Sequence, residues 1–284
     1  MTVSVCIFAH NEERCLPECI GALDAAAGDE PYEVHLMVNG CTDNTARVAR
    51  SLGAADQRIT IQELPVADKA NAWNDYVHRI APQANAHIFI DGDVQPSDTA
   101  ISALAAKLRD HPSAYAAAAL PASGRSRKQW ATKLFMDRHL SGNLYAMSNR
   151  ALNLFRERSI RLPFGAKGED GVLAYLLLTN LKGGEDDTHD HRIVVSGDAT
   201  FEFHTLGFRA RDVKAYHRRL IRYSERHFQK KVLYTLLKQG GVKAMPDNIY
   251  DIYKPSILAR ISPRFDPVNY WYDLATRRRL SARR

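Results

Sequence analysis

Two aspartates separated by a single glycine, Asp91 and Asp93, are the residues whose spacing most clearly suggests chemistry. They directly follow an apolar run, residues 86–90, which predicts a buried strand. Because side chains two positions apart on a strand point to the same side, we expect both carboxylates to face one ligand, with Gly92 leaving room for it. Paired carboxylates bind Mg²⁺ or Mn²⁺, and such a cation can hold a diphosphate. The tripeptide alone can also simply end a strand, so its interpretation depends on the residues around it.

Two further polar clusters follow predicted strands in the same way. Residues 10–12, His-Asn-Glu, follow a predicted strand over 3–8, and residues 39–41, Asn-Gly-Cys, follow one over 32–38. In a parallel sheet covered by helices, ligands bind beyond the carboxyl ends of the strands. We therefore expect the three clusters to converge on one edge of a sheet and to form a binding site there.

The elements that must position these clusters alternate between strand and helix patterns. Strands are predicted over 3–8, 32–38, 59–64, 86–90 and 114–120, and helices over 12–27, 42–52, 68–80 and 97–109, with Thr42 and Asp68 as N-caps. This alternation predicts an α/β fold with a Rossmann-like, mostly parallel sheet and helices on both faces.

The second half of the chain is less regular. We expect a mobile basic loop over 123–128, a strand over 140–148, a glycine-rich loop from Gly165 that becomes a helix at Val172, and short strands over 193–195 and 201–204. A long amphipathic helix is predicted over 211–237. We divide the chain into a catalytic domain over 1–208, with a nucleotide-binding half over 1–120 and an acceptor half over 121–208, and a basic helical C-terminal region over 209–284.

Composition places the chain among ordinary globular proteins, with 45% hydrophobic and 25% charged residues in 284. The net charge of +7 is concentrated: residues 209–238 carry ten Lys or Arg against two acidic residues, and the last eight residues carry five Arg. Such patches attract phosphates, anionic lipid headgroups or nucleic acid, although a solvated helix face with a basic tail explains them as well. No transmembrane stretch or signal peptide is evident, and the four cysteines fit reduced thiols better than zinc or disulfides, so we expect a cytoplasmic protein.

Five sequence motifs in order give the chain a family resemblance over roughly residues 2 to 210. They are residues 8–12 (FAHNE), 38–45 (VNGCTDNT), 68–74 (DKANAWN), 91–93 (DGD) and 168–170 (GED). The chain resembles the family 2 glycosyltransferases, which have the GT-A fold and use nucleotide-sugars. The resemblance implies a sugar transfer from a nucleoside diphosphate, with Mn²⁺ or Mg²⁺ as the cofactor.

The resemblance also implies roles for individual residues. Asp170 is expected to act as the catalytic base, with Glu169 positioning it or sharing the role, and Asp93 and His204 are expected to bind the metal. The residues expected to contact the nucleotide-sugar are Ala9, His10, Asn11, Glu12, Asn39, Lys69, Asp91, Gly92, Gly142 and Arg209. Asn39 stands where the family usually has an aspartate that holds the base, so the base that is bound stays open.

Simpler structural interpretations accompany several of these residues. Glu12, Glu169 and Asp170 could serve only as favourable charge at helix N-termini. Lys69 could be an exposed lysine at a helix start, and His204 a structural histidine at a strand end. For the cluster of residues 189–191, His-Asp-His, we prefer an exposed polar loop to a metal site.

The leading hypothesis is a metal-dependent, inverting glycosyltransferase that uses a UDP-sugar in preference to a GDP- or dTDP-sugar. The basic helix and tail suggest a glycan or lipid-linked acceptor and peripheral contact with an anionic membrane at its inner face, with no nucleic-acid partner. The alternatives are a nucleotidyltransferase with a related α/β core, a basic nucleic-acid-binding protein, and a non-catalytic relative. The first lacks its glycine-rich phosphate loop here, and the second lacks interleaved aromatic and basic residues.

Overall fold

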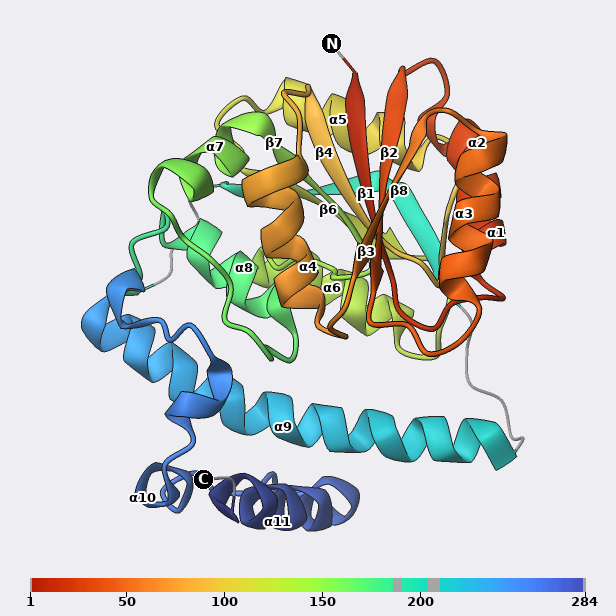
Figure 1. Ribbon diagram of the computed structural model, residues 1–284. Helices are drawn as coiled ribbons and strands as arrows, with labels where there is room; N and C mark the ends of the chain where they lie inside the picture. The colour runs from red at the N-terminus through yellow and green to blue at the C-terminus, as the bar shows by residue number, and fades with distance from the viewer. Residues whose placement is uncertain (1, 186–190, 204–209, 283–284) are drawn as a thin grey trace.

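The computed structural model describes residues 2–185, 191–203 and 210–282, and these form one mixed α/β body followed by a helical region (Figure 1). The strands lie in one sheet in the order β3-β2-β1-β4-β7-β6-β8-β5. Their bounds are β1 Val3–Ala9, β2 Tyr32–Asn39, β3 Ile59–Leu64, β4 Ala86–Asp91, β5 Val94–Pro96, β6 Ala116–Pro121, β7 Leu144–Ser148 and β8 Ile193–Phe203. The pairings β1–β2, β1–β4, β2–β3 and β6–β8 are parallel, whereas β4–β7, β6–β7 and β5–β8 are antiparallel.

The helices cover both faces of this sheet, as predicted. Their bounds are α1 Leu16–Gly21, α2 Leu23–Ala27, α3 Thr45–Ala55, α4 Lys69–Asp75, α5 Ala100–Asp110, α6 Arg127–Asp137, α7 Asn149–Glu157, α8 Glu169–Leu178, α9 Ala210–Gly240, α10 Pro255–Leu258 and α11 Pro267–Ala282. A π-helical turn, Tyr76–Ile80, extends α4, and short 3₁₀ turns, Val242–Ala244 and Ile249–Ile252, follow α9.

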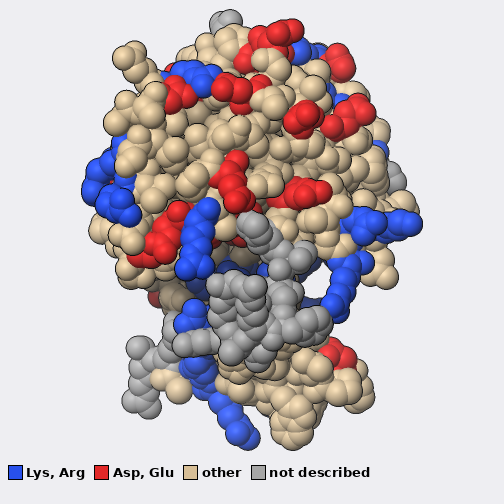
Figure 2. Space-filling view, turned by 90° about the vertical axis from the view of Figure 1, so that its right-hand side faces the viewer, with Lys and Arg blue, Asp and Glu red and all other residues tan. Residues whose placement is uncertain are grey.

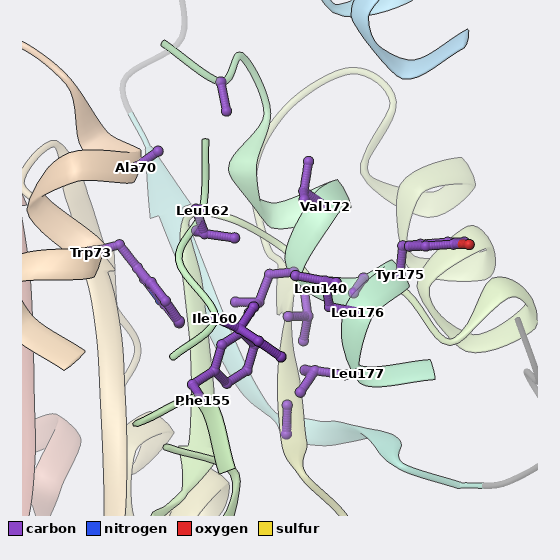
Figure 3. Close-up of a cluster of buried hydrophobic side chains, with 14 of the residues drawn as sticks. Ala70, Trp73, Leu140, Phe155, Ile160, Leu162, Val172, Tyr175, Leu176 and Leu177 are labelled. Atoms are coloured by element: carbon purple, nitrogen blue, oxygen red, sulfur yellow. The ribbon is translucent and has the colours of Figure 1, made fainter. Parts of the chain in front are cut away.

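Strand alternation sends neighbouring side chains into two separate hydrophobic cores. Val5 and Ile7 of β1 pack with α1, α2, α3 and α5, whereas Cys6 and Phe8 pack with α4, α7 and α8. Figure 3 shows part of the second core, in which Trp73 of α4 meets Phe155 of α7. Their ring centroids lie 5.1 Å apart in an edge-to-face arrangement. The predicted α/β architecture with a helical C-terminal region is therefore confirmed.

Several predicted element boundaries are wrong for identifiable reasons. Residues 12–15 form a turn and the first helix begins at Leu16, where a proline in the first turn favours a helix start. The second helix begins at Thr45, with Asn44 at the N-cap position in place of Thr42. Asp43, just before it, binds the first helical residue: its Oδ1 accepts from the Thr45 backbone N–H at 2.9 Å and from the Thr45 hydroxyl at 2.6 Å.

The second half contains more regular structure than its sequence suggested. The predicted loop over 123–128 ends in the first residues of α6, and the two short strands predicted over 193–204 are one strand, β8. The helix predicted from Val172 begins three residues earlier, at Glu169, after Gly168 with a φ of 79°. This earlier start places both acidic residues of that motif in the first turn of α8.

The C-terminal helices lie below the α/β body in Figure 1, where α9 runs along its lower side with α10 and α11 beneath it. The packing of α11 against α9 includes an ion pair of 2.6 Å between Arg279 and Glu225. Within the described ranges, no helix combines the length and the apolar composition that a bilayer crossing requires.

A buried histidine of β4 makes the stability of this fold depend on pH. His87 is fully buried, with Nδ1 2.8 Å from the Tyr76 hydroxyl and Nε2 3.2 Å from Asn149 Oδ1. Burial lowers the pKa of His87 from 6.5 to about 4, so the folded chain keeps it neutral while the unfolded chain binds a proton at higher pH. Its contribution to stability is complete above pH 6.5 and is lost as the pH falls through that window towards 4.

We therefore expect acid to destabilise the wild-type protein more than a His87→Gln variant. The difference in the loss of unfolding free energy between pH 7 and pH 4 should be about 3 kcal/mol, from a shift of about 2.5 pKa units. Denaturant unfolding of both proteins across this pH range measures it, and carboxylate titrations common to both cancel. Parallel stability profiles for the two proteins would contradict this account.

Candidate active site

One cleft of about 960 Å³ collects the polar clusters that follow β1, β2 and β4. It is closed on its other side by residues of α8, α6 and α9. In Figure 2, acidic side chains gather near the centre of the face that is drawn, and Lys and Arg side chains project just below them. The three strand ends therefore do converge on one edge, as parallel strands require.

The first two polar clusters are joined by hydrogen bonds. His10 Nδ1 lies 2.8 Å from the Asn39 carbonyl oxygen, and Asn11 Oδ1 accepts from the Thr42 backbone N–H at 2.8 Å. Asn11 has a φ of 60°, a conformation that asparagine adopts more readily than most residues. His10 and Asn39 line the cleft, whereas Ala9 and Asn11 do not. The side chain of Asn11 therefore ties the two loops together.

Asn39 carries an unsatisfied polar atom at this end of the cleft. The residue is 3% exposed, and its Oδ1 has no hydrogen-bond partner among the described residues. A buried acceptor of this kind is costly unless a ligand or water satisfies it. Asn39 thus offers a free acceptor to a ligand that enters the cleft.

Three carboxylates, those of Glu12, Asp91 and Asp93, line the same part of the cleft. Burial, followed by the negative charges of Asp93 and Asp91, raises the pKa of Glu12 to about 8. Burial, opposed by Lys69, raises the pKa of Asp91 to about 7. Between the two aspartates, the Gly92 backbone N–H donates to the Phe8 carbonyl at 2.8 Å, and a Cβ at Gly92 would lie 3.2 Å from that oxygen. The glycine therefore allows β4 to approach β1 at this point.

Lys69 connects the end of β4 with the start of α8 across the cleft. Its Nζ lies 2.5 Å from Asp91 Oδ1 and 2.9 Å from Glu169 Oε1, and it donates to the Gly142 carbonyl at 2.8 Å. Burial alone lowers the pKa of Lys69, but the two carboxylates outweigh it and hold the pKa well above its usual value. Lys69 is therefore a half-buried, charged bridge, and the interpretation as an exposed helix-start lysine is wrong.

The position of Lys69 follows from the start of α4. Asp68 caps this helix, because its side chain accepts from the Asn71 backbone N–H at 2.7 Å. The other oxygen of Asp68 accepts from the Gly165 backbone N–H at 2.7 Å, which fixes the glycine-rich loop against α4. The predicted N-cap is confirmed, and it also anchors the loop that leads to α8.

Asp170 lies in the first turn of α8 and pairs with a residue of the C-terminal region. Arg226 Nη2 of α9 is 2.8 Å from Asp170 Oδ1. Burial raises the pKa of Asp170, but Arg226, His139 and Lys69 outweigh it, so the pKa lies below its usual range. Gly142 is packed against the same side chain, since a Cβ there would lie 3.1 Å from the Asp170 Cβ. Asp170 is thus an ionised carboxylate held between a glycine and a guanidinium.

The donor atoms present fit a hard divalent cation. Mg²⁺ is usually held by one or two carboxylates together with substrate phosphates and water, and Mn²⁺ also prefers oxygen ligands. Asp93 offers such a carboxylate, with Asp91 and Glu12 in the same cleft. Among the described residues, no group of three or more His, Cys, Asp or Glu side chains is already arranged to hold a metal ion.

Two predicted residues cannot be placed. His204 and Arg209 lie outside the described residues, as do two residues of the cluster over 189–191. The predicted metal role of His204 and the phosphate role of Arg209 therefore stay predictions.

Sequence reasoning missed the wall of the cleft that α6 and α9 form. The lining residues from these helices are Trp130, Lys133, Leu134, Arg219, Arg222, Tyr223, Arg226, Gln229, Lys230, Leu233 and Tyr234. On α9, positions 219, 223, 226, 230 and 234 repeat at helical spacing and so share one face. This period was visible in the sequence, but the pattern alone does not say which body the basic face meets.

Comparisons with solved structures find the same fold. The mannosyltransferase PcManGT from Pyrobaculum calidifontis, solved with GDP-Man and Mn²⁺, has a TM-score of 0.59 and 19% identity, covering 99% of this chain and 80% of that chain. Glucosyl-3-phosphoglycerate synthase from Mycobacterium tuberculosis, solved with Mn²⁺, UDP and glucosyl-3-phosphoglycerate, has a TM-score of 0.53 and 20% identity, covering 79% of each chain. TarS from S. aureus has a TM-score of 0.53 and 14% identity, covering 99% of this chain and 90% of that chain.

A search of curated proteins found no match. The family description "Glycosyl transferase family 2", in contrast, matches residues 4–169, which is more than half of the chain. This range holds all five motifs on which the resemblance rests, apart from Asp170 at the end of the last motif. The match agrees with the fold shared with known glycosyltransferases and confirms the prediction of a glycosyltransferase. The chain therefore belongs to glycosyl transferase family 2.

Proposed function

We propose that the protein transfers a sugar from a nucleoside-diphosphate sugar to an acceptor hydroxyl, with inversion at the sugar carbon and with Mn²⁺ or Mg²⁺ as its cofactor. The observation that carries this proposal is the bridge of Lys69 between Asp91 and Glu169. It joins the acidic motif that would hold the donor to the acidic pair that would meet the acceptor. Family membership favours this activity over a nucleotidyltransferase or a nucleic-acid-binding protein.

The donor would occupy the part of the cleft at the ends of β1, β2 and β4. The free acceptor atom of Asn39 suits a base that presents an N–H group, as uracil, guanine and thymine all do, so it supports a nucleotide site without choosing among UDP, GDP and dTDP. Asp91 would contact the ribose, and His10 and Glu12 would line the nucleotide pocket. Related folds have been solved with GDP-Man in one case and UDP in another.

Asp93, together with His204, would hold the metal against the diphosphate. When bound, the cation neutralises the negative charge that develops on the leaving nucleoside diphosphate. Two of the structures with this fold contain Mn²⁺, and another crystal of the second contains Mg²⁺. Lys69 would oppose the rise in the pKa of Asp91 that burial causes, and would fix this carboxylate beside Asp93 whether or not the donor is present.

Asp170 would act as the general base. As the acceptor oxygen forms its bond to the sugar carbon, the bond from that carbon to the diphosphate oxygen breaks on the opposite side, and the acceptor proton passes to Asp170. Glu169 is held by Lys69 at 2.9 Å, which suits a positioning role better than proton transfer. Attack opposite the leaving group accounts for inversion.

The acceptor is expected to be a glycan or a lipid-linked molecule, with peripheral contact at an anionic membrane and no nucleic acid. Exposed apolar side chains support the membrane contact: Phe265 lies just before α11, and Val268 and Trp271 lie in its first turns. Exposed Arg278 lies further along the helix, and a basic and aromatic surface of this kind suits anionic headgroups.

The metal site can be tested by nucleotide binding. We expect calorimetric titrations with UDP, GDP and dTDP to show that one of them binds and that its binding requires Mn²⁺ or Mg²⁺. Asp93→Ala should abolish this metal-dependent binding, whereas Asp98→Ala, an exposed aspartate outside the cleft, should leave it unchanged. If none of the three nucleotides bound with either metal, the proposed function would be wrong.

The base can be tested by separating transfer from binding. Asp170→Asn keeps an oxygen that can accept from Arg226 but cannot take the acceptor proton. We expect the transfer rate to fall by about 10²- to 10⁴-fold while the dissociation constant of the nucleotide changes little. Transfer of a radiolabelled sugar measures the rate, with Asp110→Asn, an exposed aspartate outside the cleft, as the matched control. Wild-type transfer by Asp170→Asn would assign the base to another group.

A further inference from the structure

Three cationic side chains enter the cleft beside Asp170. They are Lys133 of α6 and Arg226 and Lys230 of α9, and we call them the cation cluster. Arg226 and Lys230 are four residues apart, so they lie on the same face of α9 one turn from each other. Lys133 lines the same space from α6.

The members of the cluster are close enough to affect one another. The pKa of Lys230 is lowered by burial first and then by the charges of Lys133 and Arg226. Lys230 Nζ lies 5.3 Å from the centre of the Tyr234 ring, and the Tyr234 hydroxyl donates to the Gly171 carbonyl at 2.7 Å. Gly171 directly follows Asp170, so the cluster rests against the first turn of α8.

The positive charge of the cluster is poorly compensated. Arg226 pairs with Asp170, but neither Lys133 nor Lys230 forms an ion pair with any carboxylate of the described residues. Two more arginines, Arg219 and Arg222, line the cleft farther along α9. Lys133 and Lys230 are exposed and Arg226 is half-buried, so solvent screens part of their mutual repulsion and an anionic ligand would offset the rest. Arg226 already binds the carboxylate of Asp170 through Nη2. Its guanidinium group has further N–H groups that can donate to a second anion.

The location assigns this anion to the acceptor. The donor diphosphate is expected at the acidic motif that follows β4, whereas the cluster adjoins the carboxylate proposed to receive the acceptor proton. A group bound by Arg226 and Lys230 therefore belongs to the molecule whose hydroxyl faces Asp170. We propose that the acceptor carries a phosphate close to the hydroxyl that receives the sugar, and that Lys133, Arg226 and Lys230 bind this phosphate. This inference rests on the proposed function.

A pair of matched double variants tests the cluster. Lys133→Gln/Lys230→Gln removes two of its charges but leaves Arg226 and Asp170 intact. Lys128→Gln/Lys231→Gln removes the same charge from exposed lysines on the same two helices that do not line the cleft. Each protein is first titrated with nucleotide and Mg²⁺, then, saturated with both, with glycerol 3-phosphate as a soluble phosphate. Phosphatidylcholine vesicles containing phosphatidic acid present the same group on a lipid.

We expect the wild-type protein and the Lys128/Lys231 variant to bind the phosphate with similar affinity. The Lys133/Lys230 variant should bind it at least about tenfold more weakly, because each hydrogen bond to a charged group contributes about 1.5–3 kcal/mol. A loss of affinity for glycerol 3-phosphate identifies a soluble acceptor. A loss of affinity for the vesicles identifies a lipid-borne acceptor.

Two outcomes would overturn the inference: no binding of either probe by the wild-type protein, or equal affinities for both double variants. A vesicle affinity that is equal for both variants, with no binding of glycerol 3-phosphate, would attribute the interaction to a membrane surface outside the cleft. The nucleotide titrations separate these results from a failure of the proposed function, since they report on the donor site alone.

Discussion

The half-buried ammonium group of Lys69 is the contact on which the arrangement of the cleft depends. It binds Asp91 at the end of β4, Glu169 at the start of α8 and the carbonyl of Gly142 before β7. Without it, two partly buried carboxylates would lie close together with no positive charge between them. Because these three contacts are far apart in the sequence, the single side chain of Lys69 links distant parts of the chain.

The donor side of the cleft was predictable because it depends on local rules. A strand followed by polar residues predicts where a parallel sheet places its ligand groups, and the clusters at 10–12, 39–41 and 91–93 obey this rule. The start of α3 was not predictable in the same way, because Asn44 and Thr42 are both good capping residues and only the loop from β1 decides between them. Glu13 contributes to this choice, since its backbone N–H donates to Asp43 Oδ2 at 3.3 Å.

The acceptor side could not be predicted from local rules. The sequence predicted a long amphipathic helix with an excess of Lys and Arg, and the helical period of α9 places Arg219, Arg226 and Lys230 on one face of it. A basic face, however, is equally stable against water, a membrane or the acidic part of another element, so sequence alone favoured a solvated or membrane-bound helix. The structure brings this face to the cleft through Arg226, whose partner Asp170 lies 56 positions earlier in the chain. The sequence pattern shows which residues share a helix face, but it does not show which distant charges pair in the fold.

Two glycines show that the contact between base and cation is specified by the backbone. A Cβ on Gly168, which has a φ of 79°, would lie 2.2 Å from Arg226 Nε, and a Cβ on Gly142 would lie 3.1 Å from the Asp170 Cβ. Larger residues at these positions would push the guanidinium or the carboxylate out of place. The charge distribution of the cleft follows from this geometry, with carboxylates at the strand ends and cations on α6 and α9. A cation at the strand ends and negative charge beside α6 and α9 would complement both groups of side chains, and the proposed metal–diphosphate donor and phosphorylated acceptor would supply them together.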